Sequence, residues 1–320
     1  MENKKQRILV TGGSGLVGTA IKNVATFFPN TEFIYLSSKN ADLRYEKELR
    51  AIISVNYPLH GIIHLAANVG GLYKNMEKPV QMLEDNLIMN TNILKIAHEM
   101  NIQNVLCFLS TCIFPDSPPK FPITTNMLHY GPPHPSNEGY AYAKRMLEVQ
   151  CRAYQKQYNR RYFCVVPTNI YGPGDNYNIQ NAHVIPALIH KCYIAKKNDE
   201  PFIIYGDGTA KRQFIYSDDI AMITLWAFNE YKNIGKPLIM CPPNSEVCII
   251  DVVQNITKAM NFRGKVIYDN SKSNGQAKKT ADTTDIENLD LNITWTSLEL
   301  GISKAVESFI QDYESSNARI

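Results

Sequence analysis

The chain has 320 residues, with 33 basic against 30 acidic side chains and a hydrophobic content of 44%, a balance typical of a globular protein. The net charge of +3 gives no electrostatic reason to expect a nucleic-acid partner, and no apolar run approaches the length of a membrane span. Seven cysteines without a Cys-x-x-Cys motif argue against a disulfide framework or a zinc site. A strand-like run begins at residue 8, so we expect no signal peptide and a cytoplasmic location.

The first half of the chain alternates short apolar runs with amphipathic stretches. The runs predicted to be buried strands are 7–11, 33–36, 61–65, 104–109 and 162–167. The stretches predicted to be helices are 16–28, 45–56, 81–100 and 141–158. This alternation is typical of βαβ units, so we predict an α/β fold with a Rossmann-type, doubly wound parallel sheet.

The regular alternation of strand and helix patterns ends at about residue 170, where longer loops begin. The elements predicted there are a helix at 183–197, a strand at 201–205, a strand and helix within 213–231, a strand at 237–241, a helix at 250–260, a strand at 266–268 and a terminal helix. We therefore predict a nucleotide-binding domain of residues 1–170 plus about 213–242. Residues of about 171–212 and 243–320 are assigned to a smaller, discontinuous α/β substrate domain.

The first predicted strand ends in a glycine-rich loop with the spacing Gly-x-x-Gly-x-x-Gly. Its residues are Gly12, Gly13, Ser14, Gly15, Leu16, Val17 and Gly18. Such glycines permit a tight turn and a close approach of the backbone to a diphosphate, and the following helix presents free N–H groups to it. The loop therefore predicts a dinucleotide site.

The end of the second predicted strand indicates which dinucleotide binds. An NAD site usually has an acidic residue there for the ribose 2′-hydroxyl, but this chain has Ser37, Ser38 and Lys39. Hydroxyl donors and the charge of Lys39 or Arg44 suit a 2′-phosphate, and Asp42 is expected near the adenine. The sequence therefore favours NADP(H) over NAD(H).

Tyr140 and Lys144 have the i,i+4 spacing of one helix face. A lysine beside a phenol lowers the phenol pKa, which makes proton exchange with a carbonyl or alcohol feasible. The spacing recurs elsewhere in the chain, so its context matters: Ser110 ends a predicted strand, at the sheet edge where ligands bind. We predict that Tyr140 is the catalytic acid, with Lys144 beside it and Ser110 bonding the same oxygen.

The glycine loop together with Ser110, Tyr140 and Lys144 resembles the extended short-chain dehydrogenase/reductase family. Six further sequence motifs resemble the branch of that family that makes GDP-L-fucose. These motifs lie at residues 65–71, 110–115, 167–173, 183–188, 212–214 and 273–280. This resemblance covers nearly the whole chain. It implies NADPH-dependent conversion of GDP-4-keto-6-deoxy-D-mannose to GDP-L-fucose, by 3,5-epimerisation and then 4-keto reduction. It also implies a homodimer formed through helices 81–100 and 141–158.

Epimerisation beside a ketone needs a base to remove a carbon-bound proton and an acid to return one. Cysteine and histidine serve well because modest shifts bring their pKa values near neutrality. The resemblance gives these roles to Cys112 and His183. Without it, Cys112 would be a small buried hydrophobe and His183 a packing residue.

The resemblance also implies the remaining contacts, with no metal. Cofactor contacts are expected from the loop 12–18 and from Ser37, Ser38, Lys39, Asp42, Leu43, Ala66, Ala67, Tyr140, Lys144, Pro167, Thr168, Asn169, Ile170 and His183. Nucleotide-sugar contacts are expected from Lys191, Tyr205, Arg212, Asn274 and Lys279. Lys191 and Tyr205 stand where bacterial members often carry Arg and Trp, which replaces a bidentate fork with a point charge.

Two other functions compete with this one. A nucleotide-sugar 4-epimerase or 4,6-dehydratase has the same fold, but it recycles bound NAD, and a dehydratase usually has a Thr-Asp-Glu-type triplet where Ser110-Thr-Cys112 stands. A redox sensor that binds NADP(H) without turnover would not need Tyr140 or Lys144. The sequence therefore favours the reductase.

Overall fold

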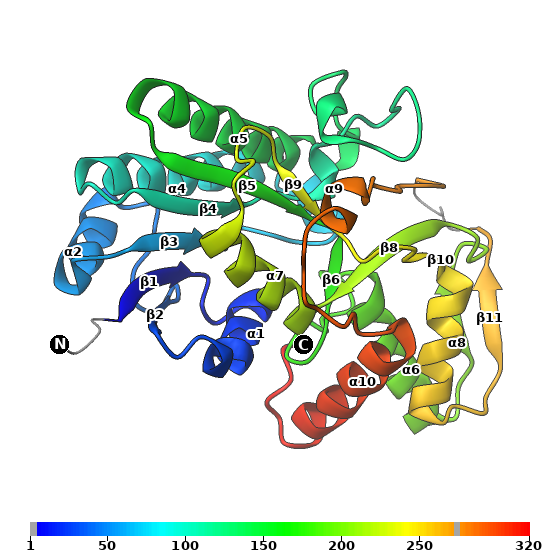
Figure 1. Ribbon diagram of the computed structural model, residues 1–320. Coiled ribbons are helices and arrows are strands. Elements are labelled where there is room, and N and C mark those ends of the chain that lie inside the picture. The colour runs from blue at the N-terminus through cyan, green and yellow to red at the C-terminus, as the bar shows by residue number, and fades with distance from the viewer. Residues whose placement is uncertain (1–4, 272–275) are drawn as a thin grey trace.

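The computed structural model describes residues 5–271 and 276–320, and its centre is a parallel sheet of six strands (Figure 1). The strand order is β2-β1-β3-β4-β5-β9. The bounds are β1 Gln6–Thr11, β2 Thr31–Leu36, β3 Gly61–His64, β4 Asn104–Phe108, β5 Arg161–Pro167 and β9 Leu238–Met240. The inner strands are almost continuously buried, as a parallel sheet covered on both faces requires. The predicted Rossmann-type fold is confirmed.

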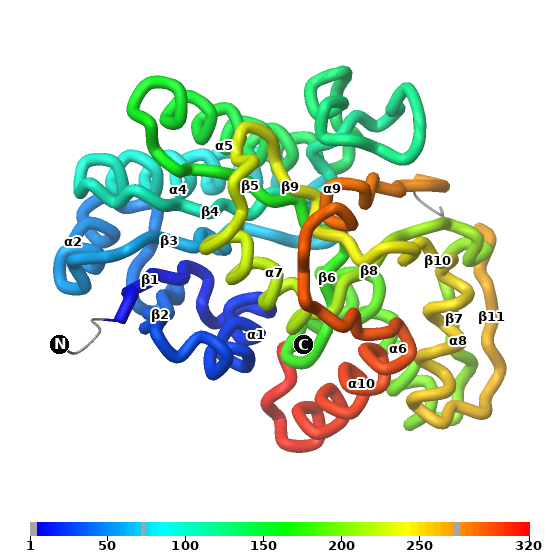
Figure 2. The backbone as a smooth tube through the Cα atoms, in the orientation of Figure 1, coloured from blue at the N-terminus to red at the C-terminus, as the bar shows by residue number. Residues whose placement is uncertain are grey.

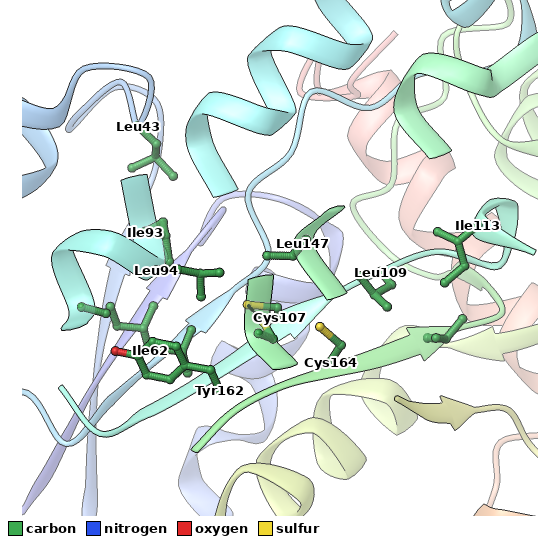
Figure 3. Packing of buried hydrophobic residues seen from close by; sticks show 14 of the residues in the cluster. Leu43, Ile62, Ile93, Leu94, Cys107, Leu109, Ile113, Leu147, Tyr162 and Cys164 are labelled. Carbon is green, nitrogen blue, oxygen red and sulfur yellow. Dashed lines mark hydrogen bonds between the residues drawn. The ribbon is translucent and has the colours of Figure 1, made fainter. Parts of the chain in front are cut away.

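Helices cover both faces of this sheet (Figure 1). One face packs against α2 (Glu46–Asn56), α4 (Pro79–Glu99) and α5 (Glu138–Tyr158), and the other against α1 (Leu16–Val24) and α7 (Ser217–Glu230). Figure 3 shows the first of these contacts, where Leu147 of α5 lies over Cys107 and Cys164. The remaining short helices are α3 Leu72–Glu77 and the 3-10 turns η1 Ala25–Phe27, η2 Thr111–Ile113, η3 Thr125–Met127 and η4 Pro135–Asn137.

The second half of the molecule has its own hydrophobic core and two small sheets. One sheet has the order β10-β8-β6, and the other pairs β11 with β7. The bounds are β6 Asn169–Tyr171, β7 Phe202–Tyr205, β8 Lys211–Tyr216, β10 Glu246–Cys248 and β11 Val266–Asp269. The helices are α6 Val184–Asn198, α8 Ile249–Met260, α9 Thr284–Glu287 and α10 Leu298–Glu314. Of these, α6, α8 and α10 enclose the second core.

One strand lies in a different sheet from the one predicted. The segment from residue 213 was expected in the nucleotide-binding domain, but β8 pairs in parallel with β6 and antiparallel with β10. Only the elements that follow it, α7 and β9, join the central sheet and its helices. An apolar run shows that a strand is buried but does not show which neighbour it pairs with. The division into two domains at the predicted boundaries stays a prediction.

A late segment of the chain ties the two halves together. The N–H of Ile123 donates to the Thr280 carbonyl at 2.8 Å, and the N–H of Asp282 donates to the Ile123 carbonyl at 2.8 Å. On its other side, Ala281 exchanges hydrogen bonds with the Gln213 side chain at 2.7 and 3.2 Å. Figure 2 shows this part of the chain, in orange, running from β11 back towards α9. The segment therefore holds β8 against the loop around residue 123.

A buried polar network lies at the carboxyl end of β1. Thr11 Oγ1 is 2.8 Å from His64 Nδ1, and His64 Nε2 is 3.0 Å from Asn90 Oδ1. The N–H groups of Leu65 and Ala66 donate to the same Thr11 oxygen at 3.2 Å each. Because that oxygen accepts two N–H bonds, its own proton goes to Nδ1, and a neutral His64 donates to Asn90 through Nε2. The network fixes β1 to β3 and α4.

This network predicts a pH-dependent loss of stability. Burial lowers the pKa of His64 below its ordinary value, so the unfolded chain takes up a proton first as the pH falls. The free energy of unfolding should therefore decrease below about pH 6.5, the ordinary histidine pKa. His64→Gln should lower stability by about 1–3 kcal/mol at pH 7.5, because buried partners lose hydrogen bonds.

The check is urea unfolding of both proteins between pH 7.5 and 5. The wild-type stability should fall more steeply with acidification than that of His64→Gln, which lacks the titrating ring. Parallel curves would show that His64 keeps an ordinary pKa in the folded state.

Candidate active site

A cavity of about 720 Å³ opens at the carboxyl ends of the central strands. It is lined by the glycine loop, by residues at the ends of β2 to β5 and by the start of α6. The sheet order places it where the chain crosses from the β1–β2 side to the β3 side, the point at which doubly wound folds bind their ligands. Most of the predicted cofactor residues line this cavity.

The glycine loop is held so close to its neighbours that side chains would not fit. A Cβ on Gly12, where φ is +69°, would lie 2.9 Å from the Ala66 nitrogen, and one on Gly18 would lie 2.5 Å from the Gly12 oxygen. Gly13 does not line the cavity; its Cβ would lie 2.7 Å from the Tyr35 Cβ. Gly13 was predicted as a cofactor contact, but it serves the packing of the loop on β2.

The first helix leaves an anion site open at its start. Helix α1 has Gly15 at its N-cap, no side-chain cap and no acidic residue in its first turn, so its first N–H groups and the positive end of its dipole face a ligand. Two buried polar atoms, Thr168 Oγ1 and Asp175 Oδ2, have no partner and belong to residues of the same cavity. Buried polar groups are rarely left unpaired. These observations suit a dinucleotide with a diphosphate and ribose hydroxyls.

Of the two cations that the sequence offers for a 2′-phosphate, Lys39 and Arg44, only one lines the end of the cavity beside β2. Ser37, Ser38 and Asp42 line it, but Lys39 is exposed and does not. Arg44 does line it, and its guanidinium is 2.6 Å from Asp42 and 3.0 Å from Asp85. The two carboxylates hold the Arg44 fork in place. Arg44 is therefore the cation of the two that lies at this end of the cavity.

Ser110, Tyr140 and Lys144 come together in the same cavity. Lys144 is buried under Tyr140, with its ammonium 5.8 Å from the centre of the Tyr140 ring, and it donates to the Phe108 carbonyl at 2.7 Å. The sequence predicts a lowered phenol pKa, but burial raises the pKa of Tyr140. Burial also lowers the pKa of Lys144 to about 8. Burial and the Cys112 thiol both favour the neutral phenol, so Tyr140 stays protonated at neutral pH.

Cys112 and His183 come from the two halves of the molecule, and each is influenced by the charge of Lys279. Cys112 lies in η2, whose N-cap Ser110 accepts a bond from the Cys112 N–H at 3.4 Å, and it lines a small hollow together with Lys279. His183 precedes α6 and lines the main cavity. Burial raises the pKa of Cys112 and the Lys279 charge opposes that shift. Burial lowers the pKa of His183, and the Lys279 charge adds to that shift. Lys279 therefore acts on both groups.

Only some of the residues predicted to contact the nucleotide sugar lie near one another in the structure. The Lys191 ammonium lies 3.8 Å from the centre of the Tyr205 ring, a cation–π pair between α6 and β7. The positive charge of Arg212 lowers the pKa of Lys279, after the larger effect of burial. Lys191, Tyr205 and Arg212 do not line the main cavity, and Asn274 lies outside the described residues. Their substrate roles stay predictions.

Several polar residues of the cavity were missed by the sequence analysis. They include Asn68, Asp85, Asp175, Asn176, Asn181 and Arg319. Asn68 follows β3, Asp85 lies on α4, and the other three follow β6, so the rule that ligands bind beyond the carboxyl ends of the central strands offered a direct signal only for Asn68. Arg319 follows the last helix, and no sequence pattern connects it with this edge.

The parallel sheet, the glycine loop and the Ser–Tyr–Lys group define a dinucleotide-binding oxidoreductase of the short-chain dehydrogenase/reductase type. Residues 8–240 match the NAD dependent epimerase/dehydratase family. The chain is 44% identical over 313 residues to a GDP-L-fucose synthase of Dictyostelium discoideum, covering 97% of each protein. It is 41% identical over 318 residues to a probable GDP-L-fucose synthase of Drosophila melanogaster, covering 97% of this chain and 98% of the relative.

A solved structure agrees with these relatives. The crystal structure of a GDP-L-fucose synthetase from Naegleria fowleri bound to NADP superposes with a TM-score of 0.91 at 39% identity, covering 99% of this chain and 96% of the other. The chain therefore belongs to the GDP-L-fucose synthases, within the NAD dependent epimerase/dehydratase family. In the part of the chain that the structure describes, no helix is long and apolar enough to cross a membrane.

The close packing of the glycine loop predicts the effect of one methyl group. Gly18→Ala places a Cβ 2.5 Å from the Gly12 oxygen and 2.6 Å from the Gly13 Cα, so the loop must shift. We expect a loss of about 1–3 kcal/mol in the free energy of unfolding, the usual cost of overpacking. Gly235→Ala is the matched control, since nothing lies within 4 Å of its Cβ. Equal thermal unfolding of both variants and the wild type would contradict the close packing.

Proposed function

We propose that this protein converts GDP-4-keto-6-deoxy-D-mannose to GDP-L-fucose with NADPH. The observation that carries the proposal concerns the end of β4. Ser110, Tyr140 and Lys144, the proposed reduction residues, line the cavity there. Cys112, the proposed base for epimerisation, follows Ser110 by two residues. The names of the relatives and the NADP in the solved structure support the same substrate and cofactor. NADPH, when bound, supplies the hydride.

The reduction step is assigned to Ser110, Tyr140 and Lys144. Tyr140 is protonated at neutral pH, because the ordinary phenol pKa is about 10 and burial raises it further. It therefore donates a proton to the C4 oxygen as negative charge develops there. Ser110 lies at the end of β4 and bonds the same oxygen. Lys144, held by the Phe108 carbonyl at 2.7 Å, stabilises the phenolate that remains.

The epimerisation steps are assigned to Cys112 and His183. A carbon-bound proton next to a ketone is removed by a thiolate, and an acid returns it on the opposite face. The Lys279 charge favours the Cys112 thiolate against the effect of burial. His183 comes from the other half of the molecule, so base and acid face the sugar from two sides.

The proposed preference for NADPH predicts that substitution of Arg44 changes the KM for NADPH and that substitution of Lys39 does not. Arg44→Ala should raise the KM for NADPH about ten- to a hundredfold, because a charge-assisted bond to the 2′-phosphate is worth about 1.5–3 kcal/mol. The KM for NADH should stay unchanged. Lys39→Ala is the matched control and should change neither value, since Lys39 does not line the cavity. Wild-type protein that uses NADH as well as NADPH would refute the assignment of NADPH.

The two catalytic groups should be separable by mutation. Cys112→Ser should slow exchange of the C3 and C5 protons by about 10²–10⁴-fold, the usual contribution of a positioned base, while slow reduction of unepimerised sugar continues. Tyr140→Phe should do the reverse, keeping exchange and losing NADPH oxidation. NMR of products formed in D₂O measures both. Cys248→Ser is the control, on β10 in the other sheet. Normal GDP-L-fucose from Cys112→Ser would make Cys112 structural.

A homodimer is the proposed assembly, with α4 and α5 as the interface. Ile88 on α4 is 44% exposed and Met146 on α5 is 40% exposed. Gln150 donates to the Thr91 hydroxyl at 2.8 Å across the same pair of helices, so the exposed apolar side chains belong to one packed surface. Exposed apolar patches of this kind mark protein interfaces.

The proposed interface predicts that a charge introduced on its surface prevents the dimer from forming. Wild-type protein should sediment as a dimer at micromolar concentration, and Met146→Glu should sediment as a monomer, because an unpaired charge in an interface is costly. Ile203→Glu, an equally exposed apolar position on β7, should leave the dimer intact. A wild-type monomer of 36.3 kDa would refute the assembly.

A cytoplasmic location is also proposed. All seven cysteines are free thiols, and six of them are buried. Thiols persist unpaired in a reducing compartment. Fractionation of cells that express the protein tests this location.

A further inference from the structure

The segment after α10 returns to the cofactor cavity. The Tyr177 N–H donates to the Arg319 carbonyl at 2.7 Å, and Asn176 and Arg319 form a parallel β-bridge. The Arg319 guanidinium donates to the Gly174 carbonyl at 3.3 Å. Main-chain bonds therefore fix the segment against the loop that follows β6, and Arg319 lines the same cavity as the glycine loop.

Arg319 differs from the other cations in that cavity. Arg44 is paired with Asp42 and Asp85, and Lys144 is buried and bonded to the Phe108 carbonyl. Among the described residues, no carboxylate lies within ion-pair distance of Arg319. An arginine fork without a carboxylate partner suits a phosphate group, to which it can donate two parallel bonds.

Asp175 adds an acceptor beside this cation. The side chain is 6% exposed, and its Oδ1 accepts the Asn176 N–H at 2.7 Å. Its Oδ2 is buried and has no partner. Arg319 lies beside Asp175, since its guanidinium bonds to the carbonyl of Gly174, the preceding residue. Burial raises the pKa of Asp175 to about 7, and the Arg319 charge opposes that shift. An orphaned buried acceptor in a ligand cavity calls for a donor on the ligand.

We propose that Arg319 and Asp175 complete the cofactor site: Arg319 pairs with the diphosphate, and Asp175 Oδ2 accepts a hydrogen bond from a ribose hydroxyl. The glycine loop and the start of α1 supply only neutral N–H donors to the diphosphate, so Arg319 contributes the full positive charge. This inference rests on NADP(H) as the proposed cofactor.

The test is isothermal titration of the full chain with NADP⁺ and with adenosine 2′-monophosphate, which lacks the diphosphate and the second ribose. Arg319→Ala should weaken NADP⁺ binding about ten- to a hundredfold, the value of a charge-assisted bond. Asp175→Asn keeps the acceptor for the Asn176 N–H but puts an amide donor at the second position. It should weaken NADP⁺ about two- to tenfold, the value of one neutral hydrogen bond.

Binding of adenosine 2′-monophosphate should not change in either variant. Arg263→Ala removes the same charge from an exposed site before β11 and should leave both affinities unchanged. If Arg319→Ala lowers the unfolding temperature of the free protein, Arg319→Gln keeps most of the side chain and replaces it in the titration.

The outcomes separate this inference from the proposed cofactor. Unchanged NADP⁺ affinity in both variants would overturn the roles of Arg319 and Asp175. An equal loss for both ligands would also overturn them, since it would mean that the segment only shapes the cavity. Wild-type protein that fails to bind NADP⁺ would instead refute the cofactor itself.

Discussion

The contact between the first loop and the ends of β2 and β3 is the constraint on which the rest of the site depends. Gly12 leaves no room for a side chain beside Ala66, and the Thr11 hydroxyl accepts the N–H groups of Leu65 and Ala66 while bonding to His64. These contacts set the direction in which α1 leaves the sheet. The open N–H groups of α1, the strand ends and the catalytic side chains are all placed relative to that loop.

Burial, rather than neighbouring charge, controls the protonation of the catalytic groups. It raises the pKa of Tyr140 and Cys112 and lowers that of Lys144, since each charged form is poorly solvated. A protonated phenol suits the donation of a proton to a ketone. The proposed role of the Cys112 thiol as a base needs the charged form, which the Lys279 charge favours and burial disfavours. Burial therefore supports the proposed acid directly, whereas the proposed base depends on a cation.

The sequence predicts those parts of the molecule that local pattern determines. Strand runs, helix periods and the glycine spacing identified the central sheet and the loop correctly, because each depends on neighbours along the chain. The pairing of β8, the packing of Gly13 against β2 and the position of Arg44 rather than Lys39 in the cavity lining depend on neighbours distant in sequence. Arg319 is the extreme case, since it is held at the cavity by a main-chain bond from Tyr177 and by a bond from its own guanidinium to the Gly174 carbonyl.

The order in which a ribosome makes the chain gives the position of Arg319 a further meaning. The glycine loop is synthesised before β9, the segment around Ala281 and Arg319, yet all of these later residues complete structures that earlier residues begin. A nascent chain can form its first βαβ units during translation. It cannot close the cavity until Arg319 has been synthesised, so a product truncated before that residue would expose an unfinished pocket to the quality-control machinery of the cell.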